Sequence, residues 1–171
     1  METTIKKARE IIPIPNDLPI VLFGTTLIIL GASIKIPMYP ISFTLHTLAI
    51  YLIALTQTPK QAFASVICYL LCATGGLPVL CGHANPLWFF GKSGGYLIAF
   101  PIAAYCIAKM KYIQPLTALL CGACIIYALG MLWLIPFFGI SIALTKGVLL
   151  FIPSEILKMV AALSIIYIRK R

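Results

Sequence analysis

The strongest candidate for a functional site is the segment Pro153-Ser-Glu-Ile-Leu-Lys158, which carries an acid and a base inside a long apolar region. In a helix, Glu155 and Lys158 lie three residues apart on one face, where their charges can neutralise each other. A charge at the centre of a membrane-spanning helix costs about 2.5–3.5 kcal/mol, so two such charges need a reason. One interpretation is an ion pair that serves packing alone. The other is a polar pocket in which Glu155 accepts N–H groups and Lys158 fixes the site or meets an anion.

Several other polar side chains lie where they could converge on the same pocket. They are Thr44 and His46 near the start of one apolar run, and Asn85, Lys92 and Tyr96 in and just after a connection that contains glycine and proline. A mostly apolar pocket with a few fixed polar groups is typical of a small-molecule site. The two histidines of the chain have no third ligand at diagnostic spacing, so we expect no metal site.

The elements that position these residues must be membrane helices. The chain has 171 residues, of which 61% are apolar and 10% charged, and its mean hydropathy is +1.05. Soluble domains are about 45–50% apolar and about 25% charged. The composition therefore predicts an all-α integral membrane protein, a single membrane domain over residues 1–171 with no room for a separate soluble domain.

Six apolar runs, separated by proline, glycine and lysine, are each close to the length of a membrane-spanning helix. We expect spans at about 19–37, 41–57, 61–75, 94–110, 115–135 and 152–168. The connection between the third and fourth spans, residues 75–93, is long and mixes polar groups with aromatic ones, so we expect a structured outer loop that acts as a lid. The region 137–168 is too long for one span, and we expect a break near Pro153, with residues 140–152 along or dipping into the outer face.

The distribution of basic residues predicts the orientation. With six spans, one side holds Lys6, Lys7, Arg9, Lys60, Lys109, Lys111, Arg169, Lys170 and Arg171, whereas the other holds Lys35, Lys92 and Lys146. The positive-inside rule then places both termini in the cytoplasm of a multi-pass protein. The net charge of +9 is explained by this topology, and we expect no nucleic acid partner.

Four stretches of the chain carry a recognisable set of motifs: Ile36-Pro-Met-Tyr-Pro-Ile-Ser-Phe-Thr-Leu-His-Thr47, Gly76-Leu-Pro-Val79, Gly91-Lys-Ser-Gly-Gly-Tyr96 and Phe151-Ile-Pro-Ser-Glu-Ile-Leu-Lys158. Together they resemble the BioY family, the biotin-specific S component of bacterial energy-coupling factor (ECF) transporters. Their order and spacing agree with the family over roughly residues 20–168. Lys158 and Tyr96 match family residues, while Glu155 stands where the family has aspartate and His46 where it has glutamine.

The resemblance implies a six-helix subunit of the bacterial cytoplasmic membrane that captures biotin from outside. A transmembrane coupling subunit and separate ATPase subunits would drive uptake, so the chain itself would be no enzyme and would hold no cofactor. We hypothesise that Glu155 and Asn85 engage the ureido head of biotin and that Lys92 helps to bind its carboxylate. The reverse arrangement, with Lys158 on the carboxylate, stays open. The alternative function is a self-sufficient, ion-coupled carrier for biotin or another small vitamin, driven through Glu155.

Overall fold

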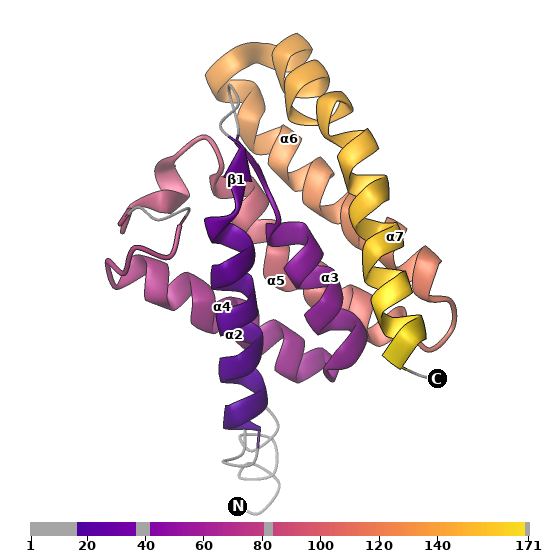
Figure 1. Ribbon diagram of the computed structural model, residues 1–171. Coiled ribbons are helices and arrows are strands. Elements are labelled where there is room, and N and C mark those ends of the chain that lie inside the picture. The colour runs from indigo at the N-terminus through magenta and orange to yellow at the C-terminus, as the bar shows by residue number, and fades with distance from the viewer. Residues whose placement is uncertain (1–16, 37–41, 81–83, 170–171) are drawn as a thin grey trace, which may run out of the picture.

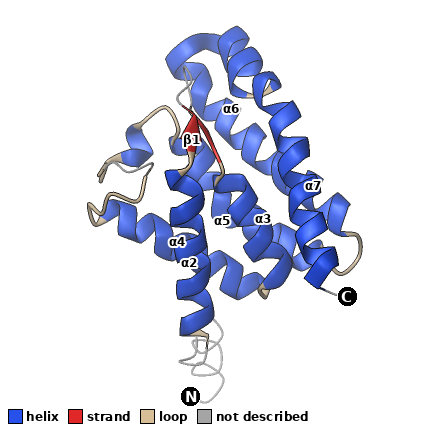
Figure 2. Ribbon diagram, viewed as in Figure 1, coloured by secondary structure: helices blue, strands red, loops and turns tan. Residues whose placement is uncertain are grey.

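The computed structural model describes residues 17–36, 42–80 and 84–169 (Figure 1). The helices are α2 (Leu18–Ser33), α3 (His46–Thr56), α4 (Pro59–Thr74), α5 (Gly94–Met110), α6 (Pro115–Gly147) and α7 (Ile152–Arg169). The strands β1 (Lys35–Ile36) and β2 (Phe43–Thr44) and the 3-10 helices η1 (Trp88–Phe90) and η2 (Leu149–Phe151) complete the described elements. The architecture is mostly helical, as the sequence predicts (Figure 2).

A small antiparallel hairpin separates α2 from α3 and departs from the predicted all-α fold. Lys35 pairs with Thr44, and Ile36 pairs with Phe43. The expected spans 19–37 and 41–57 are therefore too long, because α2 ends at Ser33 and α3 begins at His46. The sequence between the strands holds two prolines, which disfavour helix continuation; residues 37–41 lie outside the described part of the chain.

Helix α6 is longer than the predicted span 115–135, because Pro136 does not end it. Neighbouring helices and local adjustments can satisfy the backbone group that a proline frees, so a helix in an apolar environment tolerates it. The backbone instead departs from helical geometry at Gly139, with φ 78° and ψ 165°, a region that in practice only glycine adopts. After Gly147 the chain turns through η2 into α7. The expected break near Pro153 thus falls just before α7, whose second residue is that proline.

The helices run back and forth between two ends of the molecule (Figure 1). The start of α2, the α3–α4 and α5–α6 connections and the end of α7 lie towards one end, at the bottom of the view. The hairpin and the α6–α7 turn lie at the opposite end. Segments that carry the predicted site residues are therefore gathered on the side of the hairpin.

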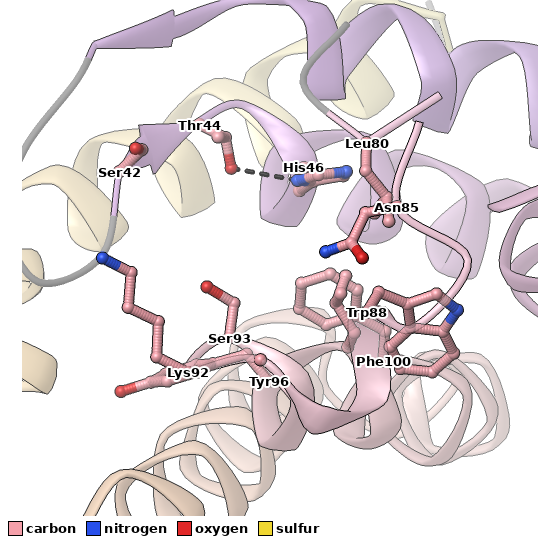
Figure 3. A pocket seen from close by; sticks show the side chains of 12 residues that line it. Ser42, Thr44, His46, Leu80, Asn85, Trp88, Lys92, Ser93, Tyr96 and Phe100 are labelled. Carbon is pink, nitrogen blue, oxygen red and sulfur yellow. Dashed lines mark hydrogen bonds between the residues drawn. The ribbon is translucent and has the colours of Figure 1, made fainter. Parts of the chain in front are cut away.

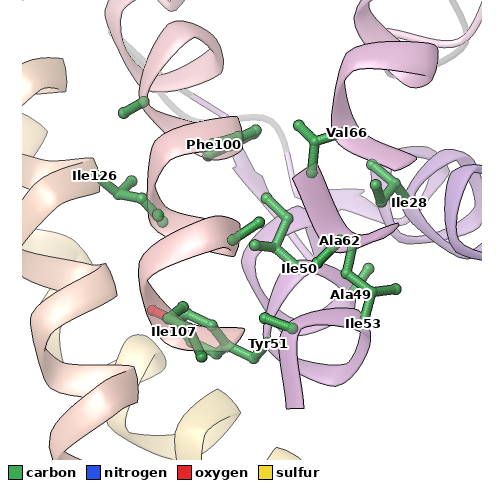
Figure 4. Packing of buried hydrophobic residues seen from close by; sticks show 14 of the residues in the cluster. Ile28, Ala49, Ile50, Tyr51, Ile53, Ala62, Val66, Phe100, Ile107 and Ile126 are labelled. Carbon is green, nitrogen blue, oxygen red and sulfur yellow. The ribbon is translucent and has the colours of Figure 1, made fainter. Parts of the chain in front are cut away.

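Helix α5 forms the centre of the packing and contacts α3, α4 and α6. Buried side chains of α5 and of four other helices form the core, including Ile28 of α2, Ile50 of α3, Val66 of α4, Ile107 of α5 and Ile126 of α6 (Figure 4). Glycines allow α5 and α6 to approach closely: a Cβ on Gly95 would lie 2.2 Å from the Cβ of Trp133. A Cβ on Gly130 would lie 2.3 Å from the Tyr96 ring. These contacts fix Tyr96 against α6.

The helices are apolar over much of their length. By length and composition, one helical stretch of the described residues, Pro115–Ile168 with its turn at η2, is sufficient to cross a membrane. Helices α2, α3 and α5 are apolar but shorter, at 10–17 residues. The composition and these helices are consistent with a membrane protein, while crossing by six separate spans stays a prediction.

Candidate functional site

A cavity of about 350 Å³ lies between the hairpin, the start of α5 and the connection that precedes it (Figure 3). The polar residues that line it are Ser42, Thr44, His46, Asn85, Lys92, Ser93 and Tyr96, and the apolar or aromatic ones are Leu80, Trp88, Leu97 and Phe100; Gly91 completes the lining. The lining therefore combines polar groups with apolar and aromatic side chains, as small-molecule sites usually do.

The connection between α4 and α5 forms one wall of this cavity. Its described residues Asn85 and Lys92 are exposed and approach from different sides in Figure 3. Trp88 is buried and its indole N–H donates to the Thr74 hydroxyl at 3.1 Å, which anchors η1 to the end of α4. The Trp133 indole N–H donates to the carbonyl of Gly91 at 3.0 Å, which ties the end of the connection to α6.

His46 lies at the start of α3 and is 5% exposed. Its Nδ1 lies 3.1 Å from the Thr44 hydroxyl and its Nε2 lies 2.6 Å from the Tyr69 hydroxyl. The ring also packs against Phe100, with 5.7 Å between ring centroids. His46 is thus held from both ring nitrogens.

A second, smaller cavity of about 50 Å³ adjoins the first. Both cavities are lined by Ser42, Thr44, Tyr96 and Phe100. The smaller one is also lined by Thr47, Ile126, Tyr127, Phe151, Glu155 and Lys158. The structure therefore brings the Glu155–Lys158 pair and the residues of the larger cavity to one region.

The Glu155 carboxylate is 3% exposed and accepts hydrogen bonds on both oxygens. Oε1 accepts from the Tyr51 hydroxyl at 2.5 Å. Oε2 accepts from the Tyr127 hydroxyl at 2.8 Å and from the Thr47 hydroxyl at 3.3 Å. Lys158 Nζ lies 3.3 Å from the same oxygen. Four donors from three helices therefore hold a carboxylate that has about four acceptor positions.

Lys158 is 6% exposed and its ammonium group is held on several sides. Nζ donates to the Thr47 hydroxyl at 2.8 Å, besides its bond to Glu155. Nζ also lies 4.5 Å from the ring centroid of Phe43 in β2, at cation–π distance. The hairpin and α3 thus compensate the buried charge together with Glu155.

Tyr96, which the sequence places at the ligand, lines both cavities but uses its hydroxyl elsewhere. The hydroxyl donates to the carbonyl of Gly147 at 2.9 Å, and the ring meets Tyr127 edge-on at 6.3 Å between centroids. Tyr96 therefore presents its ring to the cavities and joins α5 to the end of α6.

The structure gathers all seven predicted site residues around the two adjoining cavities: Thr44, His46, Asn85, Lys92 and Tyr96 line the larger one, and Glu155 and Lys158 line the smaller. Sequence reasoning missed Thr47, Tyr51 and Tyr127, which hold Glu155. Thr47 and Tyr51 are four residues apart and so share a face of α3. This shared face alone does not point to Glu155, and Tyr127 in an apolar helix gave no signal either.

Comparison with known proteins gives a consistent result. The model of the BioY family matches residues 3–171. A probable biotin transporter BioY from Pyrococcus horikoshii is 33% identical over 155 residues, which cover 88% of this chain and 93% of that protein. The biotin transporter BioY from Thermotoga maritima is 34% identical over 148 residues, covering 81% and 86% of the two chains.

The fold has a counterpart among solved structures. The crystal structure at 2.1 Å of the S-component for biotin from an ECF-type ABC transporter superposes with a TM-score of 0.78. The sequence identity to that protein is 28%, and the match covers 91% of this chain and 92% of the other.

Proposed function

The chain belongs to the BioY family, and on this premise we propose that it is the membrane subunit that captures biotin for ATP-driven uptake. The observation that carries the proposal is the pair of adjoining cavities, which combine an apolar lining with a buried ion pair and a set of hydroxyl groups. Biotin matches this combination, because it has an apolar chain and ring sulfur, a ureido head with donors and an acceptor, and one carboxylate.

Charge supports one orientation of the ligand. The Glu155–Lys158 pair is neutral as a unit and both side chains are buried. A ligand carboxylate placed beside it would leave an uncompensated negative charge in an apolar site, which is costly. The uncharged ureido head suits this place better, while the exposed Lys92 suits the carboxylate. Asn85 lines the larger cavity and can contribute to the ureido site through its amide.

The role of Glu155 in this proposal is mainly to hold other groups. Because four donors already surround the carboxylate, Glu155 fixes the Lys158 ammonium and three hydroxyl groups at the wall of the smaller cavity. It contacts the ligand at most through the remaining acceptor position on Oε1. Thr44, Tyr96 and His46 complete the wall between this pair and the rim.

The proposal includes the surroundings of the subunit. We propose six membrane spans with both termini in the cytoplasm and the connection 75–93 as an outer lid. A transmembrane coupling subunit and ATPase subunits complete the transporter. The S-component with the similar fold comes from an ECF-type ABC transporter, which supports partners of this class.

Titration calorimetry of the purified protein with biotin tests the binding site. Glu155→Gln and Lys158→Ala each disrupt the buried pair, and we expect each to weaken biotin binding at least about tenfold, or about 1.4 kcal/mol. Lys146→Gln, at an exposed residue outside the cavity lining, is the control and should bind like the unaltered protein. Undiminished affinity in both pair variants would remove Glu155 and Lys158 from the site.

Lys92→Gln tests the orientation in the same assay. If Lys92 meets the carboxylate, the variant loses affinity for biotin but not for biotin amide, which has no carboxylate charge. Equal losses for the two ligands would contradict the orientation.

Transport separates the proposed subunit from a self-sufficient carrier. Liposomes that contain the chain alone should bind biotin at their surface without accumulating it, and accumulation should require coupling and ATPase subunits with ATP. Counterflow of biotin in liposomes that lack any ATPase would favour the ion-coupled carrier instead.

A further inference from the structure

Two glycines of α6 contact the same side chain of the cavity wall, that of Tyr96. A Cβ added to Gly130 would lie 2.3 Å from Cδ1 and Cε1 of the Tyr96 ring, and a Cβ added to Gly147 would lie 2.9 Å from the Tyr96 hydroxyl oxygen. The carbonyl of Gly147 also accepts a hydrogen bond from that hydroxyl at 2.9 Å. The ring therefore lies directly against the backbone of α6 at one glycine, and its hydroxyl is held at the other.

Both glycines reach one tyrosine because α6 is not straight. Gly147 follows Gly130 by 17 positions, which corresponds to about 25 Å along an ideal helix. That distance is much longer than a tyrosine side chain. The backbone leaves helical geometry at Gly139, where φ is 78°, a conformation that favours glycine. The kink at Gly139 therefore brings the end of α6 back to Tyr96.

The Tyr96 ring is held on three sides. Besides the backbone at Gly130 and the carbonyl of Gly147, the Tyr127 ring meets it edge-on at 6.3 Å between centroids, with 82° between the ring planes. Tyr127 in turn donates to Glu155 at 2.8 Å. Because the Tyr96 hydroxyl is already bonded to α6, the side chain offers its ring to the two cavities that it lines.

We propose that Gly130 and Gly147 are positioning residues for ligand binding, which hold the Tyr96 ring as a fixed apolar wall against the middle of the ligand. The inference rests on the proposed function. With the ureido head at the buried ion pair and the carboxylate at the rim, the sulfur-containing ring of biotin lies beside the wall common to both cavities. Tyr96 belongs to this wall, and a wall that is fixed in advance need not be ordered when the ligand binds.

The two glycines act on different parts of the tyrosine. At Gly147 an added Cβ would meet two atoms at 2.9 Å, a methyl group of Leu134 and the Tyr96 hydroxyl. The Leu134 methyl ends a flexible side chain and can rotate away, whereas the hydroxyl ends a rigid ring that lies against Gly130. Gly147→Ala therefore displaces the tyrosine through its hydroxyl, and Gly130→Ala displaces it through the ring itself.

Titration calorimetry with biotin tests the contact at Gly147. We expect Gly147→Ala to weaken biotin binding at least about tenfold and Tyr96→Phe, which loses only the bond to the Gly147 carbonyl, to weaken it about threefold. In the double variant the added methyl no longer meets a hydroxyl. Its affinity should therefore return to within about twofold of that of Tyr96→Phe, since the effects of two residues in contact are not additive.

Gly130→Ala gives the opposite result in the same comparison. Its added methyl meets ring atoms that phenylalanine keeps. We therefore expect a loss of at least about tenfold that Tyr96→Phe does not restore. A general loss of stability would not distinguish the two glycines in this way.

Gly122→Ala is the matched control on the same helix. A Cβ at Gly122 would lie 2.3 Å from the Cδ1 atom of Ile107 in α5, so the substitution also disturbs the packing of α5 against α6. Neither residue lines the cavities. Gly122→Ala should lower the temperature of thermal unfolding but keep the affinity for biotin within about twofold of that of the unaltered protein.

Several outcomes would overturn the inference while leaving the proposed function intact. They are unchanged biotin binding in Gly147→Ala, a loss in Gly147→Ala that Tyr96→Phe does not restore, and an equal loss in Gly122→Ala. If Gly147→Ala fails to fold, Tyr96→Phe alone decides, and unchanged affinity in that variant would overturn the inference. An unaltered protein that does not bind biotin would overturn the proposed function itself.

Discussion

At the scale of single residues, the site depends on how completely a buried charge is compensated. Glu155 and Lys158 are each less than a tenth exposed, and the side chains that contact the pair come from α3, α6 and the hairpin. Such a pair is costly to disrupt, because removing one member leaves the other charge buried without its partner.

This energetic argument predicts opposite results for single and double variants. Glu155→Gln and Lys158→Met should each lower the free energy of unfolding by about 3–5 kcal/mol, because one buried charge loses its counterion. The double variant should recover much of that loss, since no uncompensated charge remains. Thermal unfolding in one detergent measures all three, and additive losses in the double variant would show that the two charges are not coupled.

The chemistry of the pair was predictable from the sequence, but its surroundings were not. Two opposite charges at helical spacing within an apolar run stand out against their context. Tyr51 and Tyr127 do not, because hydroxyl-bearing aromatic residues are ordinary in membrane helices. They reach Glu155 across 104 and 28 positions of the chain, and only the packing of α3, α6 and α7 brings them there.

At the scale of elements, a partly buried lysine links the ends of two helices. Lys111 follows α5, and its ammonium group donates to the carbonyls of Ala54 and Gln57 at the end of α3. The last carbonyls of a helix lack partners within the helix, and a cation there also interacts favourably with the helix dipole. Lys111 therefore connects the end of α5 to the end of α3.

A comparison of two neighbouring lysines tests this connection. Lys111→Met should lower the free energy of unfolding by about 1–2 kcal/mol, because two carbonyls lose a charged donor. Lys109→Met, at an exposed residue near the end of the same helix, should change it by less than about 0.5 kcal/mol. Equal effects of the two substitutions in thermal unfolding would show that Lys111 acts only through its charge.

The positions of most helices follow from the apolar runs, whereas their ends depend on local chemistry that the pattern does not carry. Helix α5 occupies the expected residues 94–110, because glycines mark its start and lysines its end. The predicted end of the fifth span at residue 135 lies four residues before the kink at Gly139, after which a second helical stretch continues to Gly147. The sequence indicated Pro136 as the break, but the backbone leaves helical geometry at the glycine. The hairpin of β1 and β2 is too short to leave a periodic signal.

At the scale of the whole molecule, the alternation of the helices divides the basic residues between two ends. Lys60 and Lys111 belong to the end that holds the α3–α4 and α5–α6 connections, and Lys92 and Lys146 to the side of the cavities. This arrangement agrees with the proposed orientation, in which the cavities open away from the cytoplasm.

Reporter fusions test the orientation directly. A fluorescent protein joined to either terminus should be fluorescent in bacterial cells, and a phosphatase that is active only outside the cytoplasm should stay inactive at both. A phosphatase placed in the connection 75–93 should be active. Activity at one terminus alone would require an odd number of spans.

The last helix, α7, supplies Glu155 and Lys158 to the smaller cavity, so the order of synthesis decides when that cavity is formed. Thr47, Tyr51 and Tyr127 are synthesised well before Glu155, so their hydroxyl groups enter the bilayer without the carboxylate they later hold. The smaller cavity is therefore complete only once the final helix has been made. On the proposed function, a nascent chain that stops short of this helix lacks Glu155 and Lys158 and should not bind biotin.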